Sequence, residues 1–136
     1  METYFNIRYE MDKEAVWQSI DRFIREQAPT YICVADGVIL NITNRNPEYL
    51  KVVNGSAFSI CDSSYVPIYL KWIYGIHREQ YCGSQIFMDL IKMKKYRMFF
   101  MGTSAKTLAA LKENLVKIDN RIADMTFYEP VSYTHL

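Results

Sequence analysis

Residues 58–64 read FSICDSS, and this stretch decides the fold class that the sequence predicts. Its first four residues form a short, mainly apolar run, which is typical of a buried β-strand. Asp62 stands at the exit of that strand, and the hydroxyl residues Ser63 and Ser64 follow it. In parallel sheets, ligands bind at the carboxyl ends of the strands, so these three residues become the first candidates for a site.

Strand and helix patterns alternate on both sides of this stretch. The predicted strands are 4–9, 31–35, 58–61, 96–101 and 124–128. Helical patterns lie between them, with predicted caps at Asp12, Asn46, Ser84 and Ser104, and 66–74 reads as one further helix. Parallel strands need long crossovers, which helices fill here. The pattern therefore predicts part of an α/β fold: a Rossmann-like, open and mainly parallel sheet with helices on both faces.

The composition limits the classes of function. The chain has 136 residues, half of them apolar, and 16 Lys plus Arg stand against 15 Asp plus Glu. This balance argues against a nucleic-acid partner, which usually requires a basic stripe. The three cysteines form no C-x-x-C pair, so we predict no metal site and a reducing, cytoplasmic location. The longest apolar stretch, 65–76, is interrupted by Lys71 and is shorter than the ~20 residues of a membrane-spanning helix.

Asp62 is the sharpest candidate for chemistry. A carboxylate at a strand exit faces the ligand crevice and can serve as a general base. The alternative is structural: Asp62 caps a helix that starts near Ser64 or Tyr65. Position alone leaves both interpretations open.

Two other strand exits carry candidate binding residues. Gly102, Thr103 and Ser104 could hold a phosphate with backbone N–H groups at a helix N-terminus, or could form an ordinary turn with a serine cap. Asp36, before Gly37, could bind a sugar hydroxyl or could simply belong to a turn. No D-x-D triplet occurs, so we expect no metal and no other cofactor. Three tyrosines flank these exits and are weighed as stacking or packing residues: Tyr65, Tyr69 and Tyr81.

Four stretches, in fixed order and spacing, carry a resemblance to a known family. They are 46–64 (NPEYLKVVNGSAFSICDSS), 66–87 (VPIYLKWIYGIHREQYCGSQIF), 96–104 (YRMFFMGTS) and 125–130 (MTFYEP). Together, over about residues 31–130, they resemble the WecG/TagA/CpsF family of bacterial glycosyltransferases.

The resemblance implies an inverting, metal-independent glycosyltransferase. Such an enzyme moves N-acetylmannosamine or its uronic acid from a UDP-sugar to a polyprenyl-diphosphate-linked N-acetylglucosamine. The products feed teichoic acid, capsule or exopolysaccharide synthesis in the cell wall and surface. The resemblance also implies a peripheral location at the inner face of the cytoplasmic membrane, and it leaves a homo-oligomer open.

The resemblance assigns roles to individual residues. The family's strand-end aspartate, proposed as the base, corresponds to Asp62. The strand exits and the resemblance together give these candidate substrate-binding residues: Asp36, Ser63, Ser64, Gln80, Gly83, Gln85, Gly102, Thr103 and Ser104. Three positions depart from the usual pattern: Ser63 stands in place of a glycine, Val34 to Asp36 in place of a Thr-x-Asn segment, and Gln80 in place of a basic residue. These departures leave the donor sugar open.

The resemblance also bears on the ends of the chain. The family continues beyond this point, so we expect one glycosyltransferase domain over 1–130 that is inactive as a fragment. Residues 131–136 are expected to be a non-native tail. A noncatalytic nucleotide-binding module and an oxidoreductase remain as alternatives, although the oxidoreductase lacks a G-x-G-x-x-G fingerprint.

Overall fold

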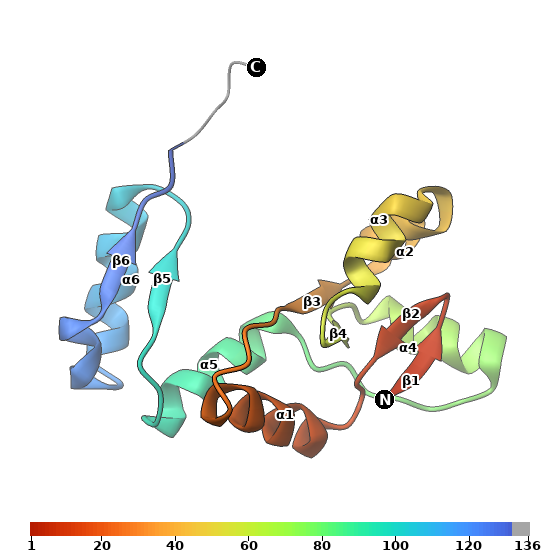
Figure 1. Cartoon of the computed structure of the whole chain (residues 1–136), viewed down its shortest axis with the longest axis horizontal. Helices are drawn as coiled ribbons and strands as arrows, with labels where there is room; N and C mark the ends of the chain where they lie inside the picture. Colours follow the sequence, from red (N-terminus) through yellow and green to blue (C-terminus); the bar gives the residue numbers. More distant parts are fainter. Residues whose placement is uncertain (132–136) are drawn as a thin grey trace. The chain divides into compact units, whose positions relative to one another are not determined.

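The computed structural model describes residues 1–131, and it shows helices alternating with short strands (Figure 1). Most strand pairs are parallel, which confirms the predicted α/β, Rossmann-like fold class. The chain forms two compact units, Met1–Gln85 and the part from Ile86 onward, and each is described here by itself. The single domain over 1–130 stays a prediction. The expected foreign tail lies, apart from Val131, outside the described residues.

The first unit contains a four-stranded sheet in the order β1-β2-β4-β3. Its strands are β1 (Glu2–Tyr4), β2 (Ile7–Tyr9), β3 (Ile32–Ala35) and β4 (Phe58–Cys61). Strands β3 and β4 run parallel, and their register ends where Ala35 pairs with Cys61. Strand β2 lies parallel to β4 on its other side, through Tyr9 and Ser59. Strand β4 is therefore central and all four of its residues are buried.

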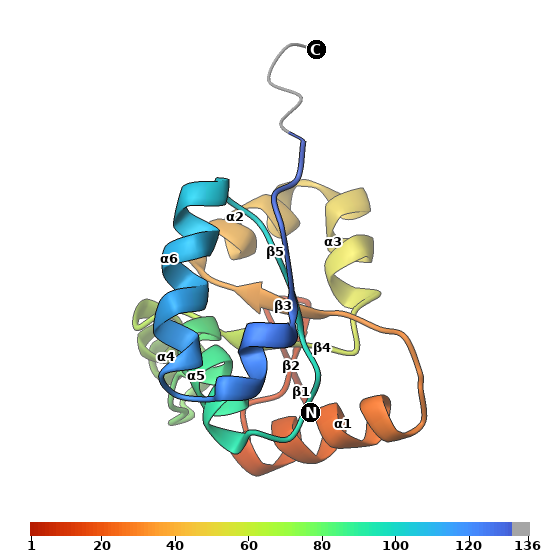
Figure 2. The same ribbon diagram turned by 90° about the vertical axis from the view of Figure 1, so that its left-hand side faces the viewer.

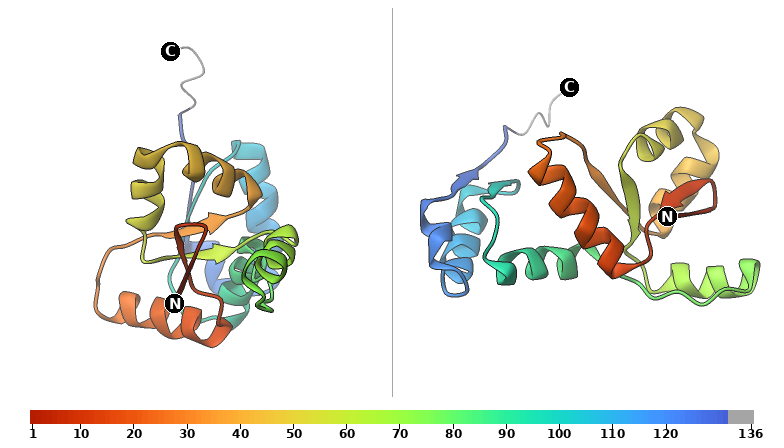
Figure 3. Two further views of the ribbon diagram at one scale, coloured as in Figure 1. Left: turned by 90° about the vertical axis from the view of Figure 1, so that its right-hand side faces the viewer. Right: turned by 60° about the horizontal axis from the view of Figure 1, so that its bottom comes forward.

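Helices cover both faces of this sheet, as the sequence predicts. The helices are α1 (Lys13–Arg25), α2 (Gly37–Arg45) and α3 (Pro47–Asn54). Figure 1 and Figure 3 show α1 on one side of the sheet and α2 with α3 on the other. Two predicted caps are confirmed, because Asp12 Oδ1 accepts from the Ala15 N–H at 2.8 Å and Asn46 Oδ1 from the Tyr49 N–H at 3.1 Å.

The N-terminus differs from the prediction of one strand over 4–9. Strands β1 and β2 form an antiparallel hairpin in which Tyr4 pairs with Ile7. The turn residues Phe5 and Asn6 have φ values of 52° and 63°. Two successive positive φ values make the tight hairpin turn that matches strand twist. The apolar alternation continues across the turn, and this is why it looked like a single strand.

The predicted helix 66–74 is two pieces of different geometry. Helix α4 (Tyr65–Tyr69) passes into a π-helical turn, η1 (Leu70–Tyr74). Gly75, with φ 69°, ends it, and the N–H groups of Gly75 and Ile76 both reach the Leu70 carbonyl. A left-handed glycine is the usual terminator of a helix.

The second unit pairs two strands beside a helix. Helix α5 (Gly83–Met93) begins in the first unit and continues into the second. The elements that follow are β5 (Phe99–Met101), α6 (Ala105–Val116), the 3₁₀ helix η2 (Asn120–Asp124) and β6 (Thr126–Tyr128). Strands β5 and β6 are parallel, with α6 alongside them (Figure 2). The predicted strands here are shortened at their starts.

Each unit has its own apolar core. The buried residues of the first core are Ile7, Tyr9, Ala35, Val53, Cys61, Val66 and Leu70. Those of the second are Ile91, Phe100, Leu115, Ile122 and Met125. The first core lies under the strand exits at Ala35 and Cys61, so the candidate residues that follow them stand on packed strands.

Candidate active site

Two carboxylates leave the sheet of the first unit side by side. Ala35 and Cys61 are paired in the last register position of β3 and β4, and Asp36 and Asp62 follow them directly. Carboxyl ends of parallel strands are where open α/β sheets bind their ligands. The sheet register thus brings together two residues that the sequence proposed separately.

Asp62 is held by one oxygen only. Its Oδ1 accepts a hydrogen bond from the Gly83 N–H at 2.7 Å, while its Oδ2 has no hydrogen-bond donor among residues 1–131. The side chain is half-buried. The carboxylate therefore has a fixed orientation and one oxygen left to accept a proton.

The interpretation of Asp62 as the cap of the following helix is wrong. The Oγ of Ser63 accepts the hydrogen bond from the Tyr65 N–H, at 3.1 Å. Ser64 occupies the capping position without a side-chain hydrogen bond to the helix. The Asp62 carboxylate instead accepts from Gly83, at the start of a later helix.

That helix is α5, and its first turn is built around the candidate residues. It begins at Gly83, so Ser84 lies inside the helix, and the prediction that Ser84 caps it is wrong. The Gln85 Oε1 accepts from the Cys82 N–H at 3.1 Å, as in a capping box. A helix N-terminus carries partial positive charge and favours a carboxylate beside it. Asp62 and Gln85 thus share the capping of α5.

Gly83 also brings this helix close to strand β3. A Cβ placed on Gly83 would lie 3.4 Å from Val34 Cγ2 and 3.8 Å from Asp62 Oδ1. Strands β3 and β4 and the start of α5 therefore converge at Gly83. The sequence singled out Gly83 only through the family resemblance, and the packing gives a physical reason for it.

Asp36 acts as a helix cap in the structure. Its Oδ1 accepts from the N–H groups of Val38 and Ile39, both at 3.0 Å. The hypothesis of a simple turn is therefore replaced by a capped helix, α2. A contact between Asp36 and a sugar hydroxyl stays a prediction.

Beneath the two carboxylates lies a buried tyrosine that the sequence analysis did not single out. Tyr9 is fully buried, and its hydroxyl donates to the Ala35 carbonyl at 3.4 Å. Burial raises the pKa of Tyr9 far above its ordinary value, and the nearby Cys61 and Asp36 add to this. Burial also raises the pKa of the Cys61 thiol. Both groups therefore stay neutral, and they pack under the site as uncharged side chains.

The remaining predicted residues of the first unit differ in exposure. Ser64, Gln80 and Gln85 are exposed, and Ser63 is half-buried. Tyr81 is only 8% exposed, its ring meets the edge of Trp17, and its N–H donates to the Cys61 carbonyl. These contacts favour a packing role for Tyr81, whereas Tyr65 and Tyr69 are exposed and can still meet a ligand.

The predicted phosphate turn lies in the second unit, and part of it is already engaged. The Gly102 N–H donates to the Tyr128 carbonyl at 3.2 Å. The Ser104 Oγ accepts from the Thr107 N–H at 3.4 Å and also contacts the Thr107 hydroxyl. These bonds agree with the alternative of a strand-to-helix turn with a serine cap. A diphosphate contact here stays a prediction.

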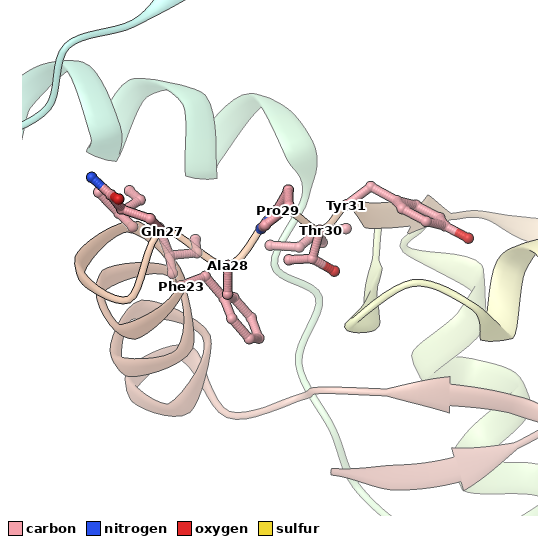
Figure 4. A pocket seen from close by; sticks show the side chains of 9 residues that line it. Phe23, Gln27, Ala28, Pro29, Thr30 and Tyr31 are labelled. Atoms are coloured by element: carbon pink, nitrogen blue, oxygen red, sulfur yellow. The ribbon is translucent and has the colours of Figure 1, made fainter.

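The first unit has two hollows that bear on a ligand site. One, of about 550 Å³, is lined by Phe5, Gly37, Leu40, Asn41, Asn44, Tyr69 and Ile73, from the elements that follow Asp36 and Asp62 and from the hairpin turn. The other, of about 410 Å³, runs from the end of α1 to the start of β3, and Figure 4 shows Phe23, Pro29 and Tyr31 around it. The walls of the first hollow include Gly37, which follows the carboxyl end of β3, and Phe5, which precedes the amino end of β2. The second hollow lies at the start of β3.

Two features of the described residues bear on partners. Within residues 1–131 no helix is long and apolar enough to cross a membrane. In the same residues no three His, Cys, Asp or Glu side chains gather in a way that could hold a metal ion. The expected independence from metals stays a prediction.

The family assignment completes this picture of the site. The model of the glycosyl transferase WecG/TagA/CpsF family matches residues 3–130, which is nearly the whole chain, and no curated protein matches it. The match covers both carboxylates, the start of α5 and the turn at Gly102. The chain therefore belongs to the WecG/TagA/CpsF family of glycosyltransferases, which act in the synthesis of cell-surface polysaccharides.

Proposed function

We propose that this protein transfers an N-acetylmannosamine-like sugar, with inversion, from a UDP-sugar to a polyprenyl-diphosphate-linked N-acetylglucosamine. The family assignment supports sugar transfer in polysaccharide synthesis. We further propose the identity of the donor and the acceptor, and a location at the inner face of the cytoplasmic membrane. The family consists of glycosyltransferases, and this favours sugar transfer over an oxidoreductase or a noncatalytic nucleotide-binding module.

The mechanism rests on one observation: within the described part of the chain, only one of the two carboxylate oxygens of Asp62 accepts a hydrogen bond. Its Oδ1 is fixed by the Gly83 N–H, while Oδ2 stays open among the described residues. In the proposed step, Oδ2 takes the proton of the acceptor hydroxyl as that oxygen attacks the anomeric carbon. The bond from this carbon to the UDP oxygen breaks on the opposite face, and UDP leaves with the electron pair. Protonated Asp62 then returns its proton to solvent.

The hollow that includes Gly37, the residue after Asp36, supports an acceptor with a lipid part. Phe5, Leu40, Tyr69 and Ile73 give it apolar walls, and the amides of two asparagines lie among them. Apolar walls with a few polar groups are typical of sites that bind small ligands. A sugar diphosphate on a hydrocarbon chain combines both characters.

The test uses the full-length protein with a panel of UDP-sugars and a lipid-diphosphate N-acetylglucosamine acceptor, and it measures the glycosylated product. Replacing a general base costs about 10²–10⁴-fold in rate, so we expect a loss of that size in turnover for Asp62→Asn. The matched control is Asp12→Asn, which makes the same change at the cap of α1, where aspartate and asparagine cap equally well. Wild-type turnover in Asp62→Asn, or no transfer from any UDP-sugar, would reject the proposal.

A further inference from the structure

The segment 76–82 determines where Gly83 lies, and Gly83 is the residue that holds Asp62. This segment joins η1 to α5 and ends directly before Gly83. At its far end it is fixed by the Tyr81 N–H, which donates to the Cys61 carbonyl at 3.1 Å, one residue before Asp62. A contact at the start of the segment would hold the same short stretch of chain at a second point.

The N-terminal hairpin of β1 and β2 packs against the chain just before this segment. The ring of Tyr74, the last residue of η1, meets Tyr4 and Phe5 edge-on, with centroids 5.1 and 5.3 Å apart. The Phe5 N–H donates to the Tyr74 hydroxyl at 3.0 Å. The hairpin turn thus anchors the chain where Gly75 reverses its direction.

The same hairpin also binds the segment itself, through an ion pair. Arg78 Nε donates to Glu2 Oε2 at 2.9 Å, and Arg78 Nη2 donates to Glu2 Oε1. The Arg78 Nη1 donates to the His77 carbonyl, which fixes the guanidinium against its own segment. A two-bond pair between arginine and a carboxylate fixes geometry as well as charge.

Each charged group shifts the pKa of the other, and the side chains of both are about a third exposed. The hydrogen bond from Arg78, ahead of one from Tyr4, lowers the pKa of Glu2. The hydrogen bond to Glu2 raises the pKa of Arg78. The pair is therefore ionised at neutral pH, and Arg78 directs its fork at Glu2 instead of at a substrate.

We propose that Glu2 and Arg78 are positioning residues for Asp62: their ion pair fixes the segment 76–82 so that the Gly83 N–H stays on the Asp62 carboxylate. This inference rests on the proposed function of Asp62 as the base. Neither residue touches the reacting atoms, and both act through the segment between them and Gly83.

The test compares turnover, KM and amide exchange in the full-length protein. A small misplacement of a reacting group can cost about 10²-fold, so we expect Arg78→Gln and Glu2→Gln each to lower kcat by about 10–100-fold, with KM for the donor little changed. The double variant should lose no more than either single one, because the pair acts as a unit. The swap Glu2→Arg with Arg78→Glu should recover part of kcat. Lys51→Gln, which breaks the exposed pair with Glu48 on α3, is the control and should keep wild-type kcat.

Hydrogen exchange at the Gly83 amide separates this inference from the proposed function. We expect faster exchange in Arg78→Gln than in wild type, in a protein that still unfolds cooperatively. Unchanged exchange and unchanged kcat in Arg78→Gln would overturn the positioning role even if Asp62→Asn is inactive. An active Asp62→Asn variant would overturn the proposed function, whatever the exchange rate. Losses in the single variants that the charge swap fails to recover would also count against the pair.

Discussion

Asp62 at the end of β4 accepts a hydrogen bond from the backbone N–H of Gly83, the first residue of α5, across 2.7 Å and 21 positions of sequence. This bond fixes one oxygen of the carboxylate at the positive end of a helix and leaves the other oxygen open. It gives Asp62 a structural role beside the chemical role that we propose for it. The two roles can be separated by substitution, because asparagine keeps an oxygen that can accept the Gly83 N–H.

Asparagine and alanine at position 62 should therefore behave differently in stability. A hydrogen bond to a charged group contributes about 1.5–3 kcal/mol, and a neutral one about 0.5–1.5 kcal/mol. We expect Asp62→Ala to lower the free energy of unfolding by about 1–3 kcal/mol, and Asp62→Asn to lower it by less. Urea denaturation measures both, alongside turnover. If both variants are equally stable, the bond to Gly83 contributes nothing and the carboxylate is held in some other way.

The parts of the fold that the sequence predicted correctly depend on local signals. The caps at Asp12 and Asn46 satisfy N–H groups within three residues, so the pattern is complete in one short window. The turn at Phe5 and Asn6 was missed, because positive φ is uncommon for residues other than glycine and a phenylalanine gives no turn signal. The π-helical turn from Leu70 was missed for the same kind of reason, since its apolar spacing resembles that of an α-helix.

The candidate site was predictable only in part. A carboxylate after an apolar strand is a local pattern, and it led to Asp62. Which amide holds that carboxylate depends on the path of 20 intervening residues, and no short window contains that information. The pair of Glu2 with Arg78 spans 76 positions of sequence and has no local signal at all. A strand-end rule therefore identifies the candidate base, while its long-range contacts become visible only in the folded structure.

Ser59, in the central strand, offers a test of burial. Its side chain is fully buried, and its Oγ has no hydrogen-bond partner among the described residues. A buried polar group without a partner costs about 1–3 kcal/mol, so we expect Ser59→Ala to leave stability unchanged or to raise it by about 1 kcal/mol. Ser56 is the matched control: it is 4% exposed and its hydroxyl donates to the Val53 carbonyl at 2.6 Å. Ser56→Ala should lower the unfolding free energy by about 1 kcal/mol. A loss at position 59 as large as that at position 56 would mean that the Ser59 hydroxyl has a partner after all.

Acid should weaken the contact between the hairpin and the segment 76–82. The Glu2 carboxylate faces Arg78, the Tyr4 hydroxyl and the N-terminal ammonium, and the hydrogen bond from Arg78 is the largest cause of its lowered pKa. A carboxyl whose folded pKa lies below its unfolded value contributes stability above the unfolded pKa, about 4.3 for glutamate, and loses it as the pH falls through the folded value. The urea midpoint of the wild type should therefore exceed that of Glu2→Gln at neutral pH. The difference should shrink as the pH falls below about 4.3. A difference that does not depend on pH would exclude the ionised pair as its source.

A second acid-sensitive pair lies in the second unit, at the start of η2. The Asp119 carboxylate is 2% exposed and accepts from the side chain of Arg121, with Nη2 at 2.8 Å and Nε at 3.1 Å. The hydrogen bond from Arg121 lowers the pKa of Asp119. This pair therefore also stabilises the fold at pH values above the ordinary pKa of an aspartate. Arg121→Met would leave the carboxylate without its cation, and we expect a lower urea midpoint at neutral pH for this variant. Because protonated Asp119 needs no cation, the deficit should fade in acid. An equal deficit at every pH would point to lost packing by the arginine stem.

Gly75 and Gly37 provide matched substitutions with opposite expectations. Neither glycine has an atom within 4 Å of an added Cβ, so space does not distinguish them. Gly75 has φ 69°, and a left-handed conformation costs other residues roughly 1–2 kcal/mol. Gly75→Ala should therefore lower the free energy of unfolding by about that amount and loosen the turn between Tyr74 and Arg78. Gly37 is the first residue of α2, without positive φ, and Gly37→Ala should raise stability by about 0.4–1 kcal/mol through the unfolded chain. Chemical denaturation of both variants decides the matter: equal effects of the two alanines would contradict the left-handed turn at Gly75.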